Sequence, residues 1–184
     1  MLGWDVDAGK LGGVAALGGR VGRSLADVAR ACGTVVLSVF NTDQVEEVVE
    51  GLLASRPAAA GPLTLICTST CDPDRIEMLV ARLPTDRVRF VEAPVSGTSE
   101  QTARGEALGL IGGDPAAMTA ARAVLDAICP RRHYLGARRQ WRPRQARDQP
   151  DPRHQSRRLR RPRRGRLGQQ RGDPGDPAAA TSGG

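Results

Sequence analysis

The sequence predicts an α/β fold built around a parallel sheet. Three short and nearly continuous apolar runs have the composition of strands that are covered on both faces: residues 34–40 (TVVLSVF), 63–67 (LTLIC) and 88–92 (VRFVE). Amphipathic segments with helix-start signals lie between these runs. Strands and helices that alternate at this spacing are typical of right-handed β-α-β units, whose strands run parallel.

Each predicted helix opens on a polar residue that can cap its first turn. Such a residue is followed either by a second polar residue three positions later or by proline at the first helical position. The helix after the first strand is expected over about 43–54. The four cap signals are Ser24 with Asp27, Asn41 with Gln44, Asp72 with Pro73, and Asp114 with Pro115.

Composition divides the chain at about residue 136. Residues 1–136 carry 13 basic and 16 acidic side chains, a net charge of −3, and enough apolar residues for the core of one domain. Residues 137–184 carry 14 arginines and four aspartates, a net charge of +10, and few large apolar residues. Such a segment cannot bury enough surface to offset its conformational entropy, so we expect a disordered basic tail.

The cysteines and the apolar pattern bear on metals and membranes. No CxxC pair occurs and no histidine neighbours a cysteine, so we expect reduced structural thiols and no metal site. No apolar run approaches the roughly 18 residues that span a bilayer. We therefore expect a cytoplasmic protein without a membrane partner. The cysteines are Cys32, Cys67, Cys71 and Cys129.

Polar residues follow the carboxyl ends of the three predicted strands. These ends read VFNT (39–42), CTST (67–70) and APVSG (93–97). In open sheets with parallel strands, ligands bind beyond the carboxyl ends. The sequence therefore predicts a ligand site at this edge of the sheet.

The stretch LGWDVDAGK (2–10) reads as the end of a strand that finishes in an acid and turns into a helix. In dinucleotide-binding folds such an acid hydrogen-bonds the ribose hydroxyls. Asp5 is the first candidate and Asp7 the second; a solvated turn acid is the alternative. A glycine-rich phosphate loop normally lies about 20 residues upstream, so we expect a sheet that lacks its first strand and phosphate loop. The glycines of residues 11–19 follow no predicted strand.

Four segments together resemble one enzyme family. GWDVDAGK, VVLSVFNTDQVEEVV, STCDP and VEAPVSGTSEQTARGEALGLIGGD match, in order and spacing, the β-hydroxyacid dehydrogenases, the relatives of 3-hydroxyisobutyrate dehydrogenase, tartronate semialdehyde reductase and 6-phosphogluconate dehydrogenase. The resemblance covers residues 3–136. It implies a Rossmann-like domain that binds NAD or NADP, hydride transfer to or from a small β-hydroxyacid, and homo-oligomeric relatives.

The resemblance also implies roles for individual residues. Asp5 followed by Val6 favours NAD over NADP. Ser96, Gly97 and Thr98 correspond to a substrate-binding Ser-Gly-Gly, and the threonine leaves the substrate's identity open. Read without the family, Ser96 is a turn hydroxyl, Asn41 is a helix cap, and Ser69-Thr70 is a strand-end cap. The residues implied to line the nicotinamide crevice are Phe40, Asn41, Thr42, Ser69 and Thr70.

The family's proton-transfer residues have no counterpart in this reading frame. The family uses a lysine with an asparagine four residues later, whereas the single lysine here is Lys10. No catalytic residue is therefore assigned, and we expect the chain as it stands to be inactive. A non-catalytic cofactor-binding remnant is an alternative.

The tail has a composition that GC-rich DNA gives when it is read out of phase. Shifting the frame across residues 144–150 permits Ala-Lys-Leu-Val-Ile-Asn, which restores the Lys-x-x-x-Asn spacing. We therefore predict that residues from about 137 onward are out of frame and that the second, helical domain is absent. A nucleic-acid-binding arginine arm is the less favoured alternative.

Overall fold

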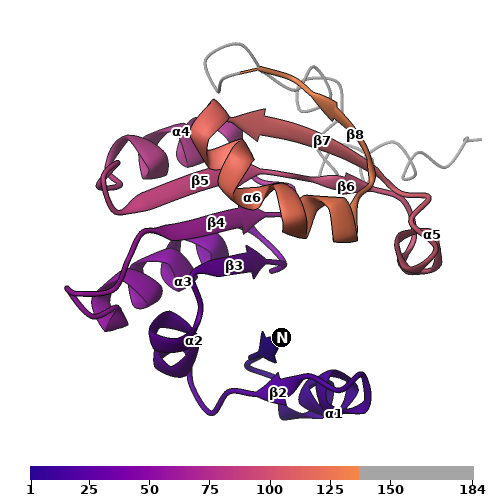
Figure 1. Ribbon diagram of the computed structural model, residues 1–184, viewed down its shortest axis with the longest axis horizontal. Helices are drawn as coiled ribbons and strands as arrows, with labels where there is room; N and C mark the ends of the chain where they lie inside the picture. The colour runs from indigo at the N-terminus through magenta and orange to yellow at the C-terminus, as the bar shows by residue number, and fades with distance from the viewer. Residues whose placement is uncertain (137–184) are drawn as a thin grey trace, which may run out of the picture. The chain divides into compact units, whose positions relative to one another are not determined.

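The structure is a computed structural model that describes residues 1–136 (Figure 1). The predictions about residues 137–184, namely the disordered tail, the reading frame and the nucleic-acid arm, lie outside the described residues. In chain order the elements are β1 (Leu2–Gly3), α1 (Ala8–Ala16), β2 (Arg20–Val21), α2 (Leu25–Ala31), β3 (Thr34–Leu37), α3 (Thr42–Ser55), β4 (Leu63–Cys67), α4 (Pro73–Ala81), β5 (Val88–Glu92), β6 (Val95–Ser96), α5 (Ser99–Ala103), β7 (Leu108–Gly113), α6 (Pro115–Ile128) and β8 (Arg131–Tyr134).

The main sheet confirms the predicted Rossmann-like α/β class. Its six strands lie in the order β3-β4-β5-β7-β6, with β8 beside β7, and β3, β4 and β5 run parallel. Strand β7 falls on a run, residues 107–113, that is β-prone in the sequence, but it runs antiparallel to both β5 and β6, whereas the sequence predicted a parallel sheet. Parallel neighbours need a long crossover, and α5 is a five-residue helix with no buried side chain, so it cannot cover the sheet as a crossover helix does.

A second, smaller sheet holds the N-terminal strands. β1 pairs with β2 in parallel, with Leu2 opposite Arg20 and Gly3 opposite Val21, and α1 connects the two strands. Figure 1 shows this β-α-β unit apart from the ladder of the main sheet. The predicted sequence of strand end, acidic turn and helix is thus confirmed for residues 2–16, and β2 was not predicted.

The core lies on both faces of the main sheet. Along β4, Leu65 packs into the cluster with α2, α3 and α4, whereas its neighbour Ile66 packs into the cluster with α6. All five residues of β4 are buried, because successive side chains of a strand point to opposite faces. Helix α6 crosses in front of β4 and β5 in Figure 1, and its buried Ala121 and Leu125 cover this face.

Strand β3 ends three residues earlier than its apolar pattern predicts. The Ser69 hydroxyl accepts a hydrogen bond from the Val39 N–H (2.9 Å) and donates one to the Val39 carbonyl (2.7 Å). The Gln44 side-chain oxygen accepts from the Phe40 N–H (2.8 Å). Side chains thus replace the strand ladder after Leu37, so the polar strand ends are built by contacts from other elements.

The four predicted helix caps are confirmed. Ser24, Asn41, Asp72 and Asp114 each occupy the N-cap of a helix, and each side chain accepts at least one backbone N–H of the first turn. Pro73 and Pro115 occupy the first helical position. Helix α3 extends one residue beyond the predicted span at each end. These caps fix where α3 and α4 begin, at the carboxyl ends of β3 and β4.

Candidate functional site

The carboxyl ends of β3 and β4 are joined by threonine and serine hydroxyls. Besides the two bonds from Ser69 to Val39, the Thr68 hydroxyl donates to the Leu37 carbonyl at 2.9 Å. All of these groups are partly buried. Because each hydroxyl holds backbone of the neighbouring strand, the two strand ends form one rigid edge from which the next residues project.

The first turns of α3 and α4 are tied together at the same edge. Asn41 caps α3 by accepting from the Gln44 N–H at 2.9 Å. The next residue, Thr42, is buried and its hydroxyl accepts from the Asp72 N–H at 2.9 Å. Asn41 and Ser69 therefore already make hydrogen bonds within the fold, as caps do. A cofactor could bind to them only through the donors and acceptors that these bonds leave over.

Two exposed residues of the predicted crevice, unlike the exposed helix cap Asn41, make no side-chain hydrogen bond within residues 1–136. The Phe40 side chain is 91% exposed, three residues after the end of β3, and Thr70 is exposed in the loop after β4. Phe40 and Thr70 are thus the members of the predicted set that are available to a ligand.

The predicted substrate triplet lies at the turn from β6 into α5. Ser96 is exposed, and its hydroxyl makes no hydrogen bond to other residues in the described part of the chain. Gly97 has φ +149°, and a Cβ there would lie 3.0 Å from the Ala107 Cβ, so the turn requires glycine. Thr98 caps α5 in a capping box with Gln101. Of the two side chains in the triplet, only that of Ser96 is free for a ligand.

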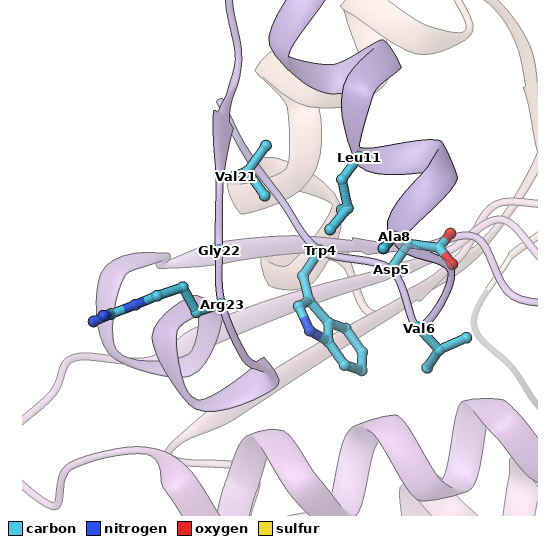
Figure 2. A pocket seen from close by; sticks show the side chains of 8 residues that line it. All are labelled: Trp4, Asp5, Val6, Ala8, Leu11, Val21, Gly22 and Arg23. Atoms are coloured by element: carbon cyan, nitrogen blue, oxygen red, sulfur yellow. The ribbon is translucent and has the colours of Figure 1, made fainter.

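A surface pocket opens beside β1 and β2. Its volume is about 600 Å³. Figure 2 shows the Trp4 ring at its centre, with Leu11 and Val21 above it in the view and the Asp5 and Arg23 side chains pointing to opposite sides. The pocket thus combines apolar walls with one carboxylate and one guanidinium. Its remaining lining residues are Val6, Ala8 and Gly22.

Asp5 and Asp7 have different tasks in the turn before α1. Asp7 is the N-cap of α1 and accepts from the Gly9 N–H at 2.8 Å. One Asp5 oxygen accepts from the Asp7 N–H at 2.8 Å, and the other lies 3.7 Å from the Lys10 ammonium. The Asp5 side chain is one-third exposed. Asp5 therefore keeps accepting capacity toward the pocket, whereas Asp7 is a helix cap.

Sequence reasoning missed three features of this region. The contact of Lys10 with Asp5 follows from the first turn of α1, which the i, i+5 spacing alone does not reveal. The apolar pocket was signalled by Trp4 directly before the candidate acid. The close approach of Cys67 and Cys71, at 3.9 Å between sulfurs, depends on the loop after β4.

The structure brings together some of the predicted site residues but not all. Residues 39–42 and 68–72 form one hydrogen-bonded cluster. Within residues 1–136, no hydrogen bond or ion pair joins this cluster to Asp5 or Ser96. Over the same residues, no three His, Cys, Asp or Glu side chains come close enough to hold a metal ion, and no helix is long and apolar enough to cross a membrane.

Comparison with known proteins agrees with this arrangement. Residues 1–136 match the model of the NAD-binding domain of 6-phosphogluconate dehydrogenase. The chain belongs to this family. Over 114 residues it is also 32% identical to L-threonate dehydrogenase of Cupriavidus necator, and this match covers 62% of this chain and 38% of that protein. The predicted membership of the β-hydroxyacid dehydrogenase group is thereby confirmed.

Solved structures share the fold. 3-Hydroxyisobutyrate dehydrogenase of Mycobacterium tuberculosis, solved with L-serine, superimposes with a TM-score of 0.67 at 24% identity, covering 73% of this chain and 45% of that one. An imine reductase of Myxococcus stipitatus, solved with NADP⁺, superimposes with a TM-score of 0.66 at 15% identity, covering 76% of this chain and 47% of that one. A variant of that reductase was solved with NAD⁺. The chain spans less than half the length of these relatives.

Proposed function

We propose that residues 1–136 bind the nicotinamide dinucleotide cofactor of a dehydrogenase that acts on a small β-hydroxyacid. The observation that carries the proposal is the rigid edge at the ends of β3 and β4, which leaves Phe40 and Thr70 open where ligands of parallel sheets bind. Family membership supports the assignment of this edge to a dinucleotide.

The residues of the N-terminal pocket fit the adenosine half of such a cofactor. Trp4, Leu11 and Val21 supply apolar surface for a base, and the Asp5 carboxylate supplies acceptors for ribose hydroxyls. When bound, the cofactor supplies hydride transfer to or from the carbinol carbon of the substrate. The tasks of this chain's own residues are then to hold the adenosine at Asp5 and to position the rest along the strand ends.

We assign NAD, rather than NADP, as the preferred cofactor. A carboxylate at this position repels a 2′-phosphate. Lys10, 3.7 Å from one Asp5 oxygen, offsets part of that charge, and the highly exposed Arg23 adds another cation at the pocket. The preference for NAD over NADP should therefore be smaller than it would be if no cation lay near the Asp5 carboxylate.

Titration calorimetry of the whole chain with NAD and with NADP tests this proposal. Asp5→Asn should weaken NAD binding by about tenfold to a hundredfold, the loss expected for a charged hydrogen bond, and should narrow the preference for NAD. Asp7→Asn is the matched control, since it removes the same charge two residues away and asparagine also caps helices well. A wild-type chain that binds neither dinucleotide contradicts the proposed function. Equal binding of NAD and NADP contradicts only the role of Asp5.

We further propose that the Ser96 hydroxyl and the backbone N–H groups beside it bind the substrate's carboxylate or hydroxyl. The free hydroxyl and the glycine-dependent turn support this role. With NAD saturating, Ser96→Ala should weaken binding of a β-hydroxyacid by about fivefold or more and leave NAD affinity unchanged. Ser99→Ala, also exposed and three residues along, is the control. Loss of NAD affinity in Ser96→Ala would instead place Ser96 at the cofactor.

Proton transfer has no assigned residue in the described part of the chain. Lys10, the single lysine of the sequence, lies against Asp5 at the adenosine pocket. We therefore expect the chain as given to bind the cofactor without oxidising a β-hydroxyacid, which NADH absorbance would detect. Turnover would contradict this expectation. Binding without turnover is also the result that a non-catalytic cofactor-binding protein would give.

A further inference from the structure

Two thiols lie side by side at the end of β4. The Cys67 and Cys71 sulfurs are 3.9 Å apart, and both thiols point at the Ser69 carbonyl oxygen, at 3.8 Å and 3.6 Å. All four cysteines of the chain are free. Cys67 is buried and held by the β4 backbone, whereas Cys71 is half-buried in the loop before α4. The pair therefore consists of one fixed inner sulfur and one outer sulfur on a loop.

The surroundings make the outer sulfur the more acidic of the two. The hydrogen bond with the Cys67 thiol lowers the pKa of Cys71 and outweighs partial burial, which raises it, and the Thr42 hydroxyl lowers the pKa further. The same hydrogen bond, together with burial, raises the pKa of Cys67. Arg75 and Glu92 also act on Cys71, with opposite signs. Since the thiolate is the nucleophile in thiol oxidation, Cys71 is the sulfur that an oxidant meets first.

We propose that Cys67 and Cys71 are a peroxide-reactive dithiol that closes to an intrachain disulfide. The Cys71 thiolate attacks one oxygen of the peroxide, so that an S–O bond forms, the O–O bond breaks and hydroxide leaves. The Cys67 sulfur then attacks the Cys71 sulfur, which forms the S–S bond, and the hydroxyl group leaves as water with the Cys67 proton. Two thiols and one hydrogen peroxide thus give one disulfide and two waters.

Closing the disulfide moves the loop and not the strand. The sulfurs must approach from 3.9 Å to about 2 Å, the length of a disulfide bond. Cys67 is the last residue of β4 and is paired with β3 on one side and β5 on the other, so the displacement falls on residues 68–71, which include Ser69 and its two bonds to Val39. If the proposed function is correct, oxidation should also weaken NAD binding, since this loop borders the cofactor site.

Mass spectrometry of the 184-residue chain tests the proposal without reference to the cofactor. The reduced protein is treated with one equivalent of hydrogen peroxide, alkylated with iodoacetamide and cleaved before aspartate. This cleavage gives a peptide of residues 43–71, which contains both thiols and neither Cys32 nor Cys129. The expected product is this peptide lighter by two hydrogens and free of alkyl groups. A peptide that takes up two alkyl groups while Cys32 is oxidised overturns the proposal.

Single substitutions separate the roles of the two sulfurs. Cys67→Ser should leave a sulfenic acid on Cys71 that a cyclic 1,3-diketone traps, whereas Cys71→Ser should leave Cys67 unlabelled. Cys32→Ser is the control and should still form the disulfide. Circular dichroism confirms folding of each variant, and the wild-type peptide map stands if one of them fails to fold. Trapping on Cys67 in Cys71→Ser would reverse the assigned order, and trapping on neither would overturn the mechanism.

Discussion

Two of the parallel β-α-β units in residues 1–136 have the same local design and different packing. In residues 2–21 a capped helix joins two strands, and in residues 34–67 another capped helix does the same. Helix α1 has no buried side chain and both residues of β2 are exposed. Helix α3 buries four side chains, and every residue of β4 is buried. The comparison shows that local signals determine which elements form, whereas packing determines how firmly they are held.

Glycine content sharpens the contrast. Helix α1 contains Gly9, Gly12 and Gly13 within nine residues, and each glycine in a helix interior costs about 1 kcal/mol relative to alanine. Helix α3 contains one glycine, Gly51, in fourteen residues. Local opening of the N-terminal unit should therefore cost less free energy than local opening of the unit that contains α3. The pocket proposed for adenosine lies in this weaker unit, so a bound ligand should stabilise it most.

The largest difference between the two units should appear when one leucine is removed from each. Leu65→Ala empties a fully buried position of β4 and should lower the free energy of unfolding by about 2–5 kcal/mol. Leu11→Ala removes a partly exposed side chain of α1 and should cost less than about 1 kcal/mol. Urea denaturation followed by circular dichroism measures both. Equal losses would mean that the N-terminal unit unfolds together with the main sheet as one cooperative structure.

How far the sequence predicts this structure depends on where the decisive contacts lie. The bounds of β4 and β5 equal the predicted runs, because strands covered on both faces are apolar at every position. Strand β3 is shorter than predicted because Ser69, thirty residues away from Val39, takes over its backbone groups. Strands β2 and β8 were missed because RV and RRHY contain no apolar run.

The site follows the same rule. Asn41 and Asp72 were predicted as caps from their immediate neighbours, whereas the cap role of Thr98 was missed. The exposure of Phe40 and the pairing of Lys10 with Asp5 are set by three-dimensional placement, which one sequence does not contain. The order of the motifs in the sequence thus predicted which edge of the sheet holds the site. The structure was needed to show which polar side chains at that edge are helix caps and which are free to bind a ligand.

A second prediction places alanine at one glycine of each helix and expects opposite signs. At Gly51 of α3 a Cβ would lie 2.6 Å from the Leu25 Cδ2 atom, so Gly51→Ala must displace the Leu25 side chain between α2 and α3 and should destabilise by about 1–3 kcal/mol. At Gly12 of α1 nothing lies within 4 Å, so Gly12→Ala should stabilise by about 0.5–1 kcal/mol.

Hydrogen exchange can measure the effect of Gly12→Ala on α1 itself, which a global unfolding experiment does not resolve. The amides of α1 should become more protected in Gly12→Ala, and those of β4 should stay the same. A Gly51→Ala chain as stable as the wild type would show that Leu25 repacks without cost, and the packing contrast between the helices would then rest on the leucine pair alone.

The smallest expected effect comes from the ion pairs of the two units. Lys10 and Asp5 are 3.7 Å apart with the lysine two-thirds exposed, and pairs of this kind contribute about 0–1 kcal/mol. Lys10→Gln should therefore leave the unfolding midpoint almost unchanged in both low and high salt.

Arg75 instead contacts Glu46 through two nitrogens, at 2.6 Å and 3.3 Å, and reaches Asp43 at 2.6 Å, so that it links α4 to α3. Because a forked guanidinium holds carboxylates in a fixed geometry that an ammonium or amide cannot reproduce, Arg75→Gln should lower the midpoint more than Lys10→Gln does, and salt should reduce the difference. A Lys10→Gln midpoint that falls as far as that of Arg75→Gln would mean that the turn holding Asp5 depends on its ion pair, and the N-terminal unit would then be held by electrostatics where the main sheet is held by packing.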